Sequence, residues 1–317
     1  MKCFVTGGAG FVGSNVVDRL LGDGHEVVCF DDFSTGQQRF LELAQGRTGF
    51  RLVRGSILDA DAVQNASRGC ETVFHFAANA DVRFGPDHPG RDLEQNTIGT
   101  FNVLEAMRKN GIARIAFSST GSVYGEAPVI PTPEDAPFPV QTSLYGASKL
   151  AGEGLIGAYC EAFGMRGWIF RFVSILGERY SHGHVFDFCR SLFKDPSTLR
   201  VLGDGTQKKS YLYVKDCVDA IMIALEKARE KVNILNLGTD EYVQVSDSVG
   251  IITRELGLAP ALSYAGGSRG WIGDNPFILL KCDRIRSLGW RPRETIADSI
   301  RKTVRYIREN RWLLEAR

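Results

Sequence analysis

Three side chains in this chain have the chemistry for proton transfer: Thr120, Tyr145 and Lys149. Tyr145 and Lys149 are four residues apart in a segment with helical spacing, so both should project from one helix face. A phenol with an ordinary pKa of ~10 is a poor base at neutral pH, but a neighbouring ammonium group or a cationic cofactor ring favours the phenolate. The hydroxyl of Thr120 can hold a substrate oxygen and relay its proton. The trio therefore predicts oxidation at a carbon that bears a hydroxyl group.

A glycine-rich turn near the start of the chain indicates what accepts the hydride. Gly7, Gly10 and Gly13 lie between a β-rich run, Lys2–Thr6, and a helical pattern, Phe11–Leu21. Without Cβ atoms, such a backbone can approach a pyrophosphate at the N-terminus of the helix. The turn alone is a weak signal, but this strand–turn–helix context predicts dinucleotide binding.

The acidic residue that follows the second strand favours NAD over NADP. Asp31 lies at the end of the apolar run Glu26–Phe30, about 20 residues after the glycines,. Its carboxylate would accept hydrogen bonds from the adenosine ribose and repel a 2′-phosphate. The alternative is that the glycines form only a tight turn and that Asp31 is a surface acid.

Apolar runs separated by helical segments predict the fold class. Beyond the first strand, runs of this kind occupy residues 26–30, 50–54, 72–76, 114–118, 168–173 and 232–237. Strands that alternate with helices imply a parallel sheet covered on both faces. We therefore expect an α/β fold, a Rossmann-type doubly wound parallel sheet, with a smaller and discontinuous α/β substrate lobe. The predicted dinucleotide domain spans 1–175 and about 210–240, and the lobe spans about 176–209 and 241–317.

Composition argues against several other classes of protein. The 38 basic and 37 acidic residues give a formal net charge of +1, which does not favour binding to nucleic acid or to a membrane surface,. The seven cysteines are scattered and form no CxxC pair, which is typical of thiols in a reducing compartment,. Because we find neither an apolar leader nor an apolar run of membrane-spanning length, we expect a cytoplasmic protein.

At these residues the chain resembles the extended short-chain dehydrogenase/reductase family, and within it the nucleotide-sugar 4-epimerases that act on UDP-glucose and UDP-galactose. The resemblance covers nearly the whole sequence. Its motifs are TGGAGFVGS at 6–14, FHFAA at 74–78, NTIGTFNVLEA at 96–106, SSTGSVYG at 118–125, YGASK at 145–149, GDGTQ at 203–207, YVKD at 213–216 and LGW at 288–290.

The resemblance implies a role for each matching position. The catalytic set would be Thr120, Tyr145 and Lys149. The positions that line NAD would be Gly7, Gly10, Phe11, Val12, Gly13, Asp31, Asp32, Ile57, Phe76, Ala77, Ala78, Asn96, Ser118, Tyr145 and Lys149. Those that contact a nucleotide sugar, with a UDP-sugar favoured, would be Arg83, Thr120, Ser174, Lys209 and Arg269.

The chain departs from the family pattern at three places, which comprise four residues. Ser56 replaces an acid that often follows the third strand, and Ser174 replaces an Asn that contacts the sugar nucleotide. Lys209-Ser210 stands where Arg-Asp is usual; lysine can neutralise phosphate but lacks the two-pronged fork of arginine,. Because all three positions concern ligand contacts, the pattern predicts the chemistry better than the substrate.

The residues directly after Thr120 separate the reactions of the family. Related 4,6-dehydratases resemble one another in an Asp-Glu pair at this place, whereas this chain has Gly121 and Ser122. Neither can serve as an acid or base, so the sequence favours 4-epimerisation through a transient 4-keto sugar. A dehydratase or decarboxylase of the same family and a non-catalytic NAD-binding regulator remain alternatives.

The remaining expectations concern histidines, the sugar and oligomerisation. His75, within a buried strand pattern, is expected to be a core residue. No metal site is expected around His182 and His184, which either border the sugar-nucleotide pocket or lie in solvent.

The bulk of Phe277-Ile278-Leu279 favours unsubstituted hexoses or uronic acids. Segments 96–109 and 143–163 resemble helices that pair across a dimer in this family, so we expect a homodimer.

Overall fold

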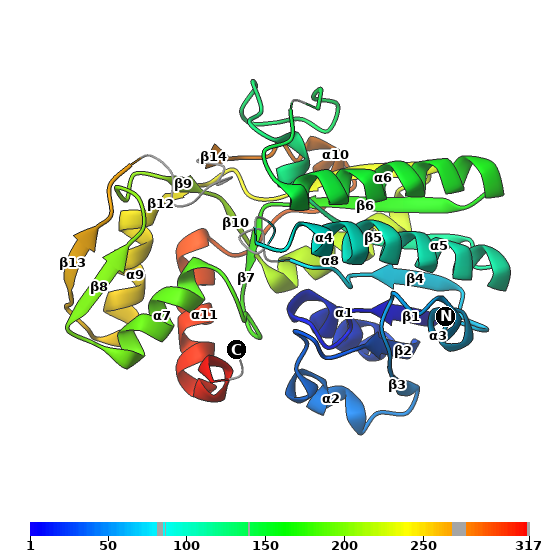
Figure 1. Ribbon diagram of the computed structural model, residues 1–317, viewed down its shortest axis with the longest axis horizontal. Helices are drawn as coiled ribbons and strands as arrows, with labels where there is room; N and C mark the ends of the chain where they lie inside the picture. Colours follow the sequence, from blue (N-terminus) through cyan, green and yellow to red (C-terminus); the bar gives the residue numbers. More distant parts are fainter. Residues whose placement is uncertain (81–84, 86, 139, 268–276, 316–317) are drawn as a thin grey trace.

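The computed structural model describes residues 1–80, 85, 87–138, 140–267 and 277–315, and a seven-stranded sheet lies at its centre (Figure 1). The strand order is β11-β6-β5-β4-β1-β2-β3, and every pairing is parallel. The strands are β1 (Lys2–Thr6), β2 (Glu26–Asp31), β3 (Phe50–Arg54), β4 (Thr72–His75), β5 (Arg114–Thr120), β6 (Arg166–Phe172) and β11 (Val232–Leu237). The order reverses between β1 and β4, which is where open sheets of this kind bind ligands.

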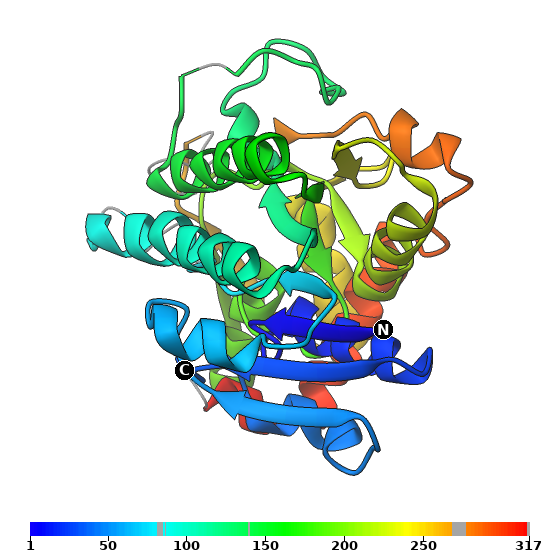
Figure 2. The ribbon, with the colours of Figure 1, turned by 90° about the vertical axis from the view of Figure 1, so that its right-hand side faces the viewer.

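Helices cover both faces of this sheet (Figure 2). One face carries α1 (Phe11–Gly22) and α8 (Val214–Lys227), whose buried side chains join one apolar core. The other carries α3 (Ala60–Ala66), α5 (Gly99–Asn110) and α6 (Leu144–Phe163), which share a second core. This arrangement confirms the predicted Rossmann-type doubly wound α/β fold.

The central strands are apolar without alternation because both of their faces are buried. In β1, Cys3 and Val5 pack into the core on the α1 side, whereas Phe4, between them, packs into the core on the α5 side. All three side chains are fully buried. Successive residues of a strand point to opposite faces, so a sheet covered on both sides needs an apolar residue at every position.

A smaller unit holds a third apolar core. Its helices are α7 (His184–Lys194), α9 (Val245–Leu256) and α11 (Ile296–Glu309). Three small sheets complete it: β7 (Ser174–Leu176) with β10 (Tyr211–Tyr213), β8 (Thr198–Val201) with β13 (Ala261–Tyr264), and β9 (Lys208–Lys209) between β12 (Val243–Gln244) and β14 (Phe277–Ile278).

The remaining elements are short. They are α2 (Glu42–Gln45), α4 (Pro89–Asp92), α10 (Asp283–Ser287), a π-helical segment at Leu93–Ile98, and 3₁₀ turns at Gln38–Leu41, Gly121–Tyr124 and Arg311–Leu314. Within the described ranges, no helix has both the length and the apolar character needed to cross a membrane.

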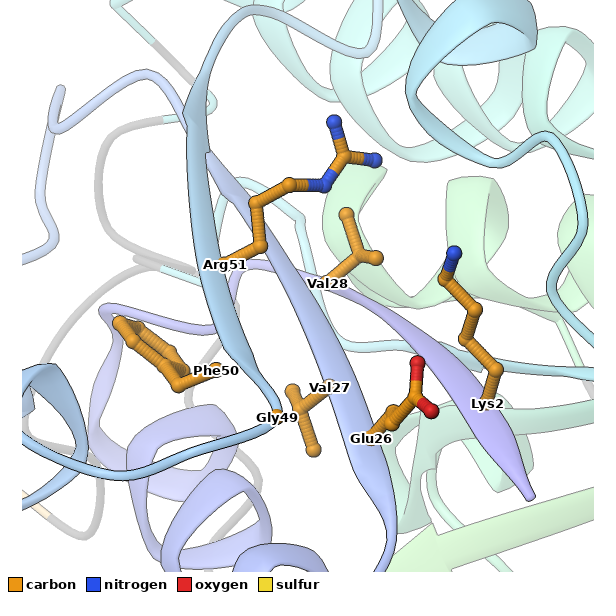
Figure 3. A pocket seen from close by; sticks show the side chains of 7 residues that line it. All are labelled: Lys2, Glu26, Val27, Val28, Gly49, Phe50 and Arg51. Atoms are coloured by element: carbon orange, nitrogen blue, oxygen red, sulfur yellow. The ribbon is translucent and has the colours of Figure 1, made fainter.

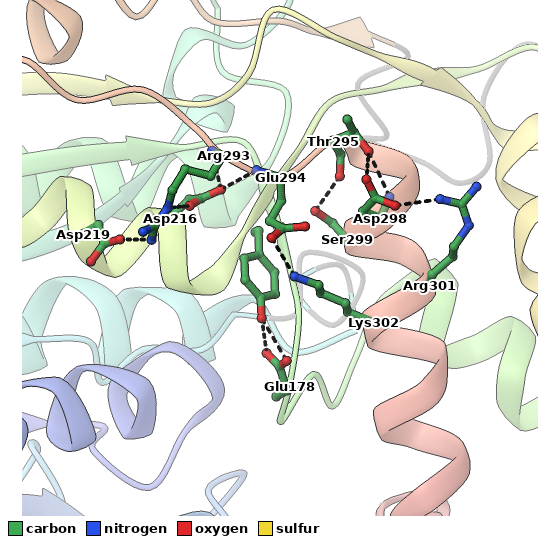
Figure 4. Close-up of polar contacts among 11 residues, drawn as sticks. Glu178, Asp216, Asp219, Arg293, Glu294, Thr295, Asp298, Ser299, Arg301 and Lys302 are labelled. Carbon is green, nitrogen blue, oxygen red and sulfur yellow. Dashed lines mark hydrogen bonds and ion pairs between the residues drawn. The ribbon is translucent and has the colours of Figure 1, made fainter.

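Asp216, the acid of the YVKD motif, fastens the chain ahead of α11 to the sheet domain (Figure 4). Its side chain is buried and accepts hydrogen bonds from the backbone N–H groups of Arg293 and Glu294, at 2.9 and 3.0 Å. Glu294 in turn pairs with Lys302 of α11 at 2.6 Å. These contacts join the start of α8 to the C-terminal helix, so the motif serves the assembly of the two units.

Candidate active site

The fold brings the three predicted proton-transfer residues together at the carboxyl edge of the sheet. Thr120 is the last residue of β5, and its hydroxyl accepts a hydrogen bond from the N–H of Ser122 at 3.1 Å. Helix α6 begins beside it, where the Oγ of Ser143 accepts a hydrogen bond from the N–H of Gly146 at 3.0 Å. Tyr145 therefore lies in the first turn of α6, where it forms a hydrogen bond with Thr120.

Lys149 lies one turn further along α6 and is held by strand β5. Its Nζ donates to the carbonyl oxygen of Ser118 at 2.8 Å and lies 4.8 Å from the ring centre of Phe117. Only 2% of the residue is exposed. Burial lowers the pKa of this ammonium group to about 7, although the charges of Asp92 and Glu153 oppose the change.

The protein groups around Tyr145 do not make its phenol acidic. Burial raises the pKa of Tyr145 to about 12; the hydrogen bond with Thr120 opposes this rise, and the negative charge of Asp92 adds to it. The expectation that Lys149 favours the phenolate is therefore not met by these groups alone. The physical reason is that the ammonium group of Lys149 is directed at the Ser118 carbonyl while burial dominates at the phenol.

The predicted glycine loop is packed too tightly for other residues at two positions. Gly7 has a φ of +67°, and a Cβ atom there would lie 2.5 Å from the backbone nitrogen of Ala77. A Cβ atom on Gly13 would lie 2.1 Å from the carbonyl oxygen of Gly7. The glycine loop thus lies against the segment 76–78 after β4. It also packs on the start of α1, which carries Phe11 and Val12.

The acid at the end of β2 also supports this loop. Asp31 is 7% exposed; one of its carboxylate oxygens accepts the N–H of Ala9 at 2.9 Å and the other that of Phe33 at 2.8 Å. The pKa of the Asp31 carboxyl is raised overall, because the effect of burial exceeds the opposite effect of these two backbone hydrogen bonds. Asp32 caps the same turn by accepting the N–H of Ser34 at 2.8 Å.

Two other predicted cofactor positions lie on the α5 side of the sheet. Ile57 is buried, and a Cβ atom on Gly99 would lie 2.4 Å from its Cδ1. Asn96 is 1% exposed within the π-helical segment, and its amide donates to the Ser148 hydroxyl at 2.9 Å. Asn96 thus connects α6 with Asn79, which follows the predicted cofactor positions 76–78.

The predicted substrate residues approach Thr120 from the smaller unit. Lys209 pairs with Ile278 between β9 and β14, and a Cβ atom on Gly121 would lie 3.0 Å from the Ile278 Cγ2. Ser174, exposed at the start of β7, follows β6 by two residues, and the last residue of β6 pairs with Thr120. Arg83 and Arg269, the other two predicted residues, lie outside the described residues.

A buried ion pair beneath the site escaped the sequence analysis. Arg171 of β6 is 1% exposed and pairs with Glu153 of α6 at 2.6 Å. Glu153 also accepts a hydrogen bond from the hydroxyl of Ser119, which precedes Thr120. The pair thus ties strand β5, strand β6 and helix α6 together. The signal was available, since Glu153 is four residues after Lys149 and Arg171 interrupts an apolar strand.

The histidines have structural surroundings. His75 is fully buried, as predicted, between the hydroxyls of Thr6 at 2.7 Å and Thr100 at 3.0 Å, and burial lowers its pKa to about 3. His184 begins α7 and bonds to the hydroxyls of Ser248 and Tyr211. His184 is half-buried, and burial lowers its pKa to about 3 as well.

A depression of about 180 Å³ lies at the opposite edge of the sheet (Figure 3). It is lined by Lys2, Glu26, Val27, Val28, Gly49, Phe50 and Arg51, at the amino ends of β1 to β3. Thr120 and Asp31 lie at carboxyl ends, so this depression is separate from the candidate active site.

The glycine loop, the acid after β2 and the Thr-Tyr-Lys trio together define an enzyme of the NAD-dependent Rossmann class. A family model for the NAD-dependent epimerase/dehydratase family matches residues 3–238. The chain belongs to this family, as its sequence predicted.

Individual relatives match over almost their full length. A UDP-glucose 4-epimerase from Mycolicibacterium smegmatis is 35% identical over 320 residues, covering 97% of this chain and 99% of the relative. The structure of a UDP-glucose 4-epimerase from Thermotoga maritima with UDP-glucose has a TM-score of 0.88 at 30% identity, covering 98% and 99% of the two chains. A dTDP-glucose 4,6-dehydratase from Streptomyces venezuelae with NAD bound has a TM-score of 0.91 at 27% identity, covering both chains fully.

The residues of this chain fit the cofactor of the family. The contact between Gly7 and Ala77 leaves no room for a side chain where a pyrophosphate would approach, and the N-terminus of α1 points to the same place,. The Asp31 carboxylate lies at the end of β2, where the adenosine ribose is expected,.

Proposed function

We propose that this chain is a 4-epimerase of nucleotide sugars, with a UDP-hexose or UDP-uronic acid as substrate. The observation that carries the proposal is the surroundings of Gly121, directly after Thr120. A Cβ atom there would lie 3.0 Å from Ile278 and 3.3 Å from the carbonyl oxygen of Phe172. A side chain at this position would fit only if Ile278 and the Phe172 carbonyl moved by a few tenths of an ångström. Glycine itself supplies no acid or base for elimination, whereas the trio needed for oxidation is assembled.

In this mechanism Thr120 holds the C4 hydroxyl of the sugar and Tyr145 removes its proton. When bound, NAD would accept the C4 hydride and return it to the other face of the sugar, and its cationic ring would favour the phenolate of Tyr145. Lys149 lies one turn after Tyr145 on α6, and the Ser118 carbonyl orients its ammonium group. Tyr145 finally gives the proton back to the C4 oxygen, so the reaction is redox-neutral.

The remaining site assignments are part of this proposal. The NAD site comprises Gly7, Gly10, Phe11, Val12, Gly13, Asp31, Asp32, Ile57, Phe76, Ala77, Ala78, Asn96, Ser118, Tyr145 and Lys149. The substrate site comprises Arg83, Thr120, Ser174, Lys209 and Arg269. The UDP-glucose in the Thermotoga maritima relative supports a uridine nucleotide, and the cation of Lys209 suits a diphosphate.

A second candidate is dehydration of a nucleotide sugar, because the dehydratase from Streptomyces venezuelae matches the whole fold. The two reactions differ in product mass. An epimerase returns a product of unchanged mass with inverted C4, whereas a dehydratase product is lighter by one water.

The test is incubation with a panel of UDP-, dTDP-, GDP- and CDP-sugars, followed by mass spectrometry and assignment of C4 stereochemistry. Tyr145→Phe should reduce turnover at least ~1,000-fold, because the base is removed while the ring that packs in the site is kept. Tyr264→Phe, an exposed tyrosine in β13, is the control and should stay active. Full activity of Tyr145→Phe, or loss of water from the sugar, would contradict the proposal.

The enzyme is proposed to be a homodimer that pairs through α5, α6 and the π-helical segment before α5. Four apolar side chains there are 44–55% exposed: Leu93, Ile98, Phe101 and Phe163. Such a strip is typical of an interface. Phe101→Glu should yield monomers in analytical ultracentrifugation, and a wild-type protein that sediments as a monomer at micromolar concentration would contradict the dimer.

The chain is also proposed to divide into an NAD domain (1–175 with about 210–240) and a nucleotide-sugar lobe (about 176–209 and 241–317). Most residues of the first two cores belong to the NAD domain, and most residues of the third core belong to the lobe. A cytoplasmic location is supported by seven free, buried cysteines, which a reducing compartment maintains,.

A further inference from the structure

A buried carboxylate that the proposed mechanism does not use lies close to the catalytic helix. Asp92 is the last residue of the short helix α4, directly before the π-helical segment, and is 1% exposed. The carboxylate faces the start of α6: a Cβ atom on Gly85 would lie 2.8 Å from its Oδ2 and 3.6 Å from the Leu144 Cβ. A charged group is rarely buried to this extent unless its surroundings hold it in place.

Hydrogen bonds connect Asp92 to both sides of the site. Its Oδ1 accepts from the side-chain amides of Asn79, at 2.8 Å, and Asn96, at 3.3 Å. Asn79 follows the predicted cofactor-lining residues 76–78, and its backbone N–H donates to the Asn96 Oδ1 at 2.8 Å. Asn96 donates to the Ser148 hydroxyl at 2.9 Å, and Ser148 donates to the carbonyl oxygen of Tyr145 at 2.8 Å.

The same carboxylate is a charge that both catalytic groups of α6 experience. Asp92 raises the pKa of Tyr145 and also that of Lys149. Among the residues that the structure describes, the other groups that act on this pair are Glu153, which raises the pKa of Lys149, and His75, whose own pKa Lys149 lowers. Glu153 belongs to α6 itself and pairs with Arg171, and Asp92 approaches the pair from α4.

We propose that Asp92 is a positioning residue that ties the segment after β4 to the catalytic helix and supplies the negative charge opposite Tyr145 and Lys149. Through Asn96 and Ser148 it fixes where the first turn of α6 stands relative to the cofactor segment. Through its charge it keeps Lys149 cationic in a buried place. This role rests on the proposed epimerase function, but part of it can be measured without substrate.

Two variants separate the effect of the Asp92 charge from the effect of its hydrogen bonds to α6 through Asn96 and Ser148. Asp92→Asn keeps an oxygen that can accept from Asn79 and Asn96 but removes the charge. Removing a negative charge lowers the pKa of every nearby group, so both limbs of the pH–rate profile should move to lower pH by about 1 unit. Ser148→Ala breaks the link to α6 without changing charge, so kcat should fall about 10-fold while both limbs stay in place.

The matched control is Glu94→Gln, an exposed carboxylate two residues after Asp92. It should change neither kcat nor the limbs. Limbs that stay in place in Asp92→Asn, or that move equally in Glu94→Gln, would overturn the charge role of Asp92. An unchanged kcat in Ser148→Ala would overturn the positioning role of the hydrogen bonds that join Asn96, Ser148 and Tyr145.

The readout without substrate is the pH dependence of urea unfolding. Burial lowers the pKa of Lys149 to about 7, so between about pH 7 and the unfolded value near ~10.4 the unfolded chain binds a proton that the folded chain lacks. This contribution to stability therefore rises with pH from about 7, and comparison with Lys149→Met isolates it. In the Asp92→Asn background the rise should begin about 1 unit lower.

The two kinds of failure can be distinguished. If Asp92→Asn does not change the pH at which stability begins to rise, the charge role of Asp92 is overturned, even if nucleotide sugars are epimerised. If that pH does shift but the protein turns over none of the sugars, the charge role of Asp92 is supported and only the proposed function is overturned.

Discussion

Replacing Gly13 by alanine should weaken NAD binding and destabilise the protein, although alanine is the better helix former. Gly13 lies in the first turn of α1, and an alanine Cβ would stand 2.1 Å from the carbonyl oxygen of Gly7. Real Cβ atoms essentially never approach closer than 3.0 Å, so the loop and the helix must separate by about 1 Å. This movement occurs where the pyrophosphate of the cofactor would lie.

The magnitude follows from two opposing terms. Alanine gains about 1 kcal/mol over glycine in a helix, whereas overpacking a well-packed site costs about 1–3 kcal/mol. The net effect is a loss of up to about 2 kcal/mol in the free energy of unfolding. A displacement of about 1 Å in a site that must fit its ligand should weaken NAD binding tenfold or more.

Gly154→Ala is the matched control. Gly154 is an exposed residue within α6, and a Cβ atom there would meet no heavy atom within 4 Å. This variant should gain about 0.5–1 kcal/mol and bind NAD normally. Urea unfolding and calorimetric titration with NAD check both variants. If Gly13→Ala binds NAD as tightly as the wild type and is equally stable, the loop is not closely packed and the reasoning is refuted.

Two further predictions concern buried groups outside the loop. Arg171→Met should lower the free energy of unfolding by about 3–5 kcal/mol, because it leaves the Glu153 carboxylate buried without its partner. In urea unfolding, the double variant Arg171→Met/Glu153→Gln should recover much of this loss. Equal stability of the single and the double variant would contradict this explanation. Because burial lowers the pKa of His75 to about 3, only the unfolded chain binds its proton below about pH 6.5, so stability should fall as pH falls, by up to about 1.4 kcal/mol per unit. His75→Gln should flatten that slope in unfolding experiments between pH 6.5 and 4, and an unchanged slope would show that His75 is not the group responsible.

The strands and the site loop could be predicted because their signals are local. Runs such as Glu26–Phe30 lie within a residue or two of the observed β2 and its neighbours, since burial on both faces requires continuous apolar sequence,. Glycines between a strand and a helix likewise identify the loop by their spacing alone. Helices α7 and α9 were not predicted, because their apolar faces pack on elements that are distant in the chain.

The sequence by itself determined the family, the parallel sheet and the trio Thr120, Tyr145 and Lys149, because motif spacing and residue type carry that information. Only the tertiary structure decided how the trio is supported and charged. Arg171 of β6 pairs with Glu153 of α6, 18 residues away in the chain, and Asp92 reaches α6 through Asn96, whose partner Ser148 is 52 residues further along. Such long-range contacts form only when the elements have packed together. The pKa of a group such as Tyr145 depends on what buries it, and burial exists only once β4, β5 and α6 have packed together.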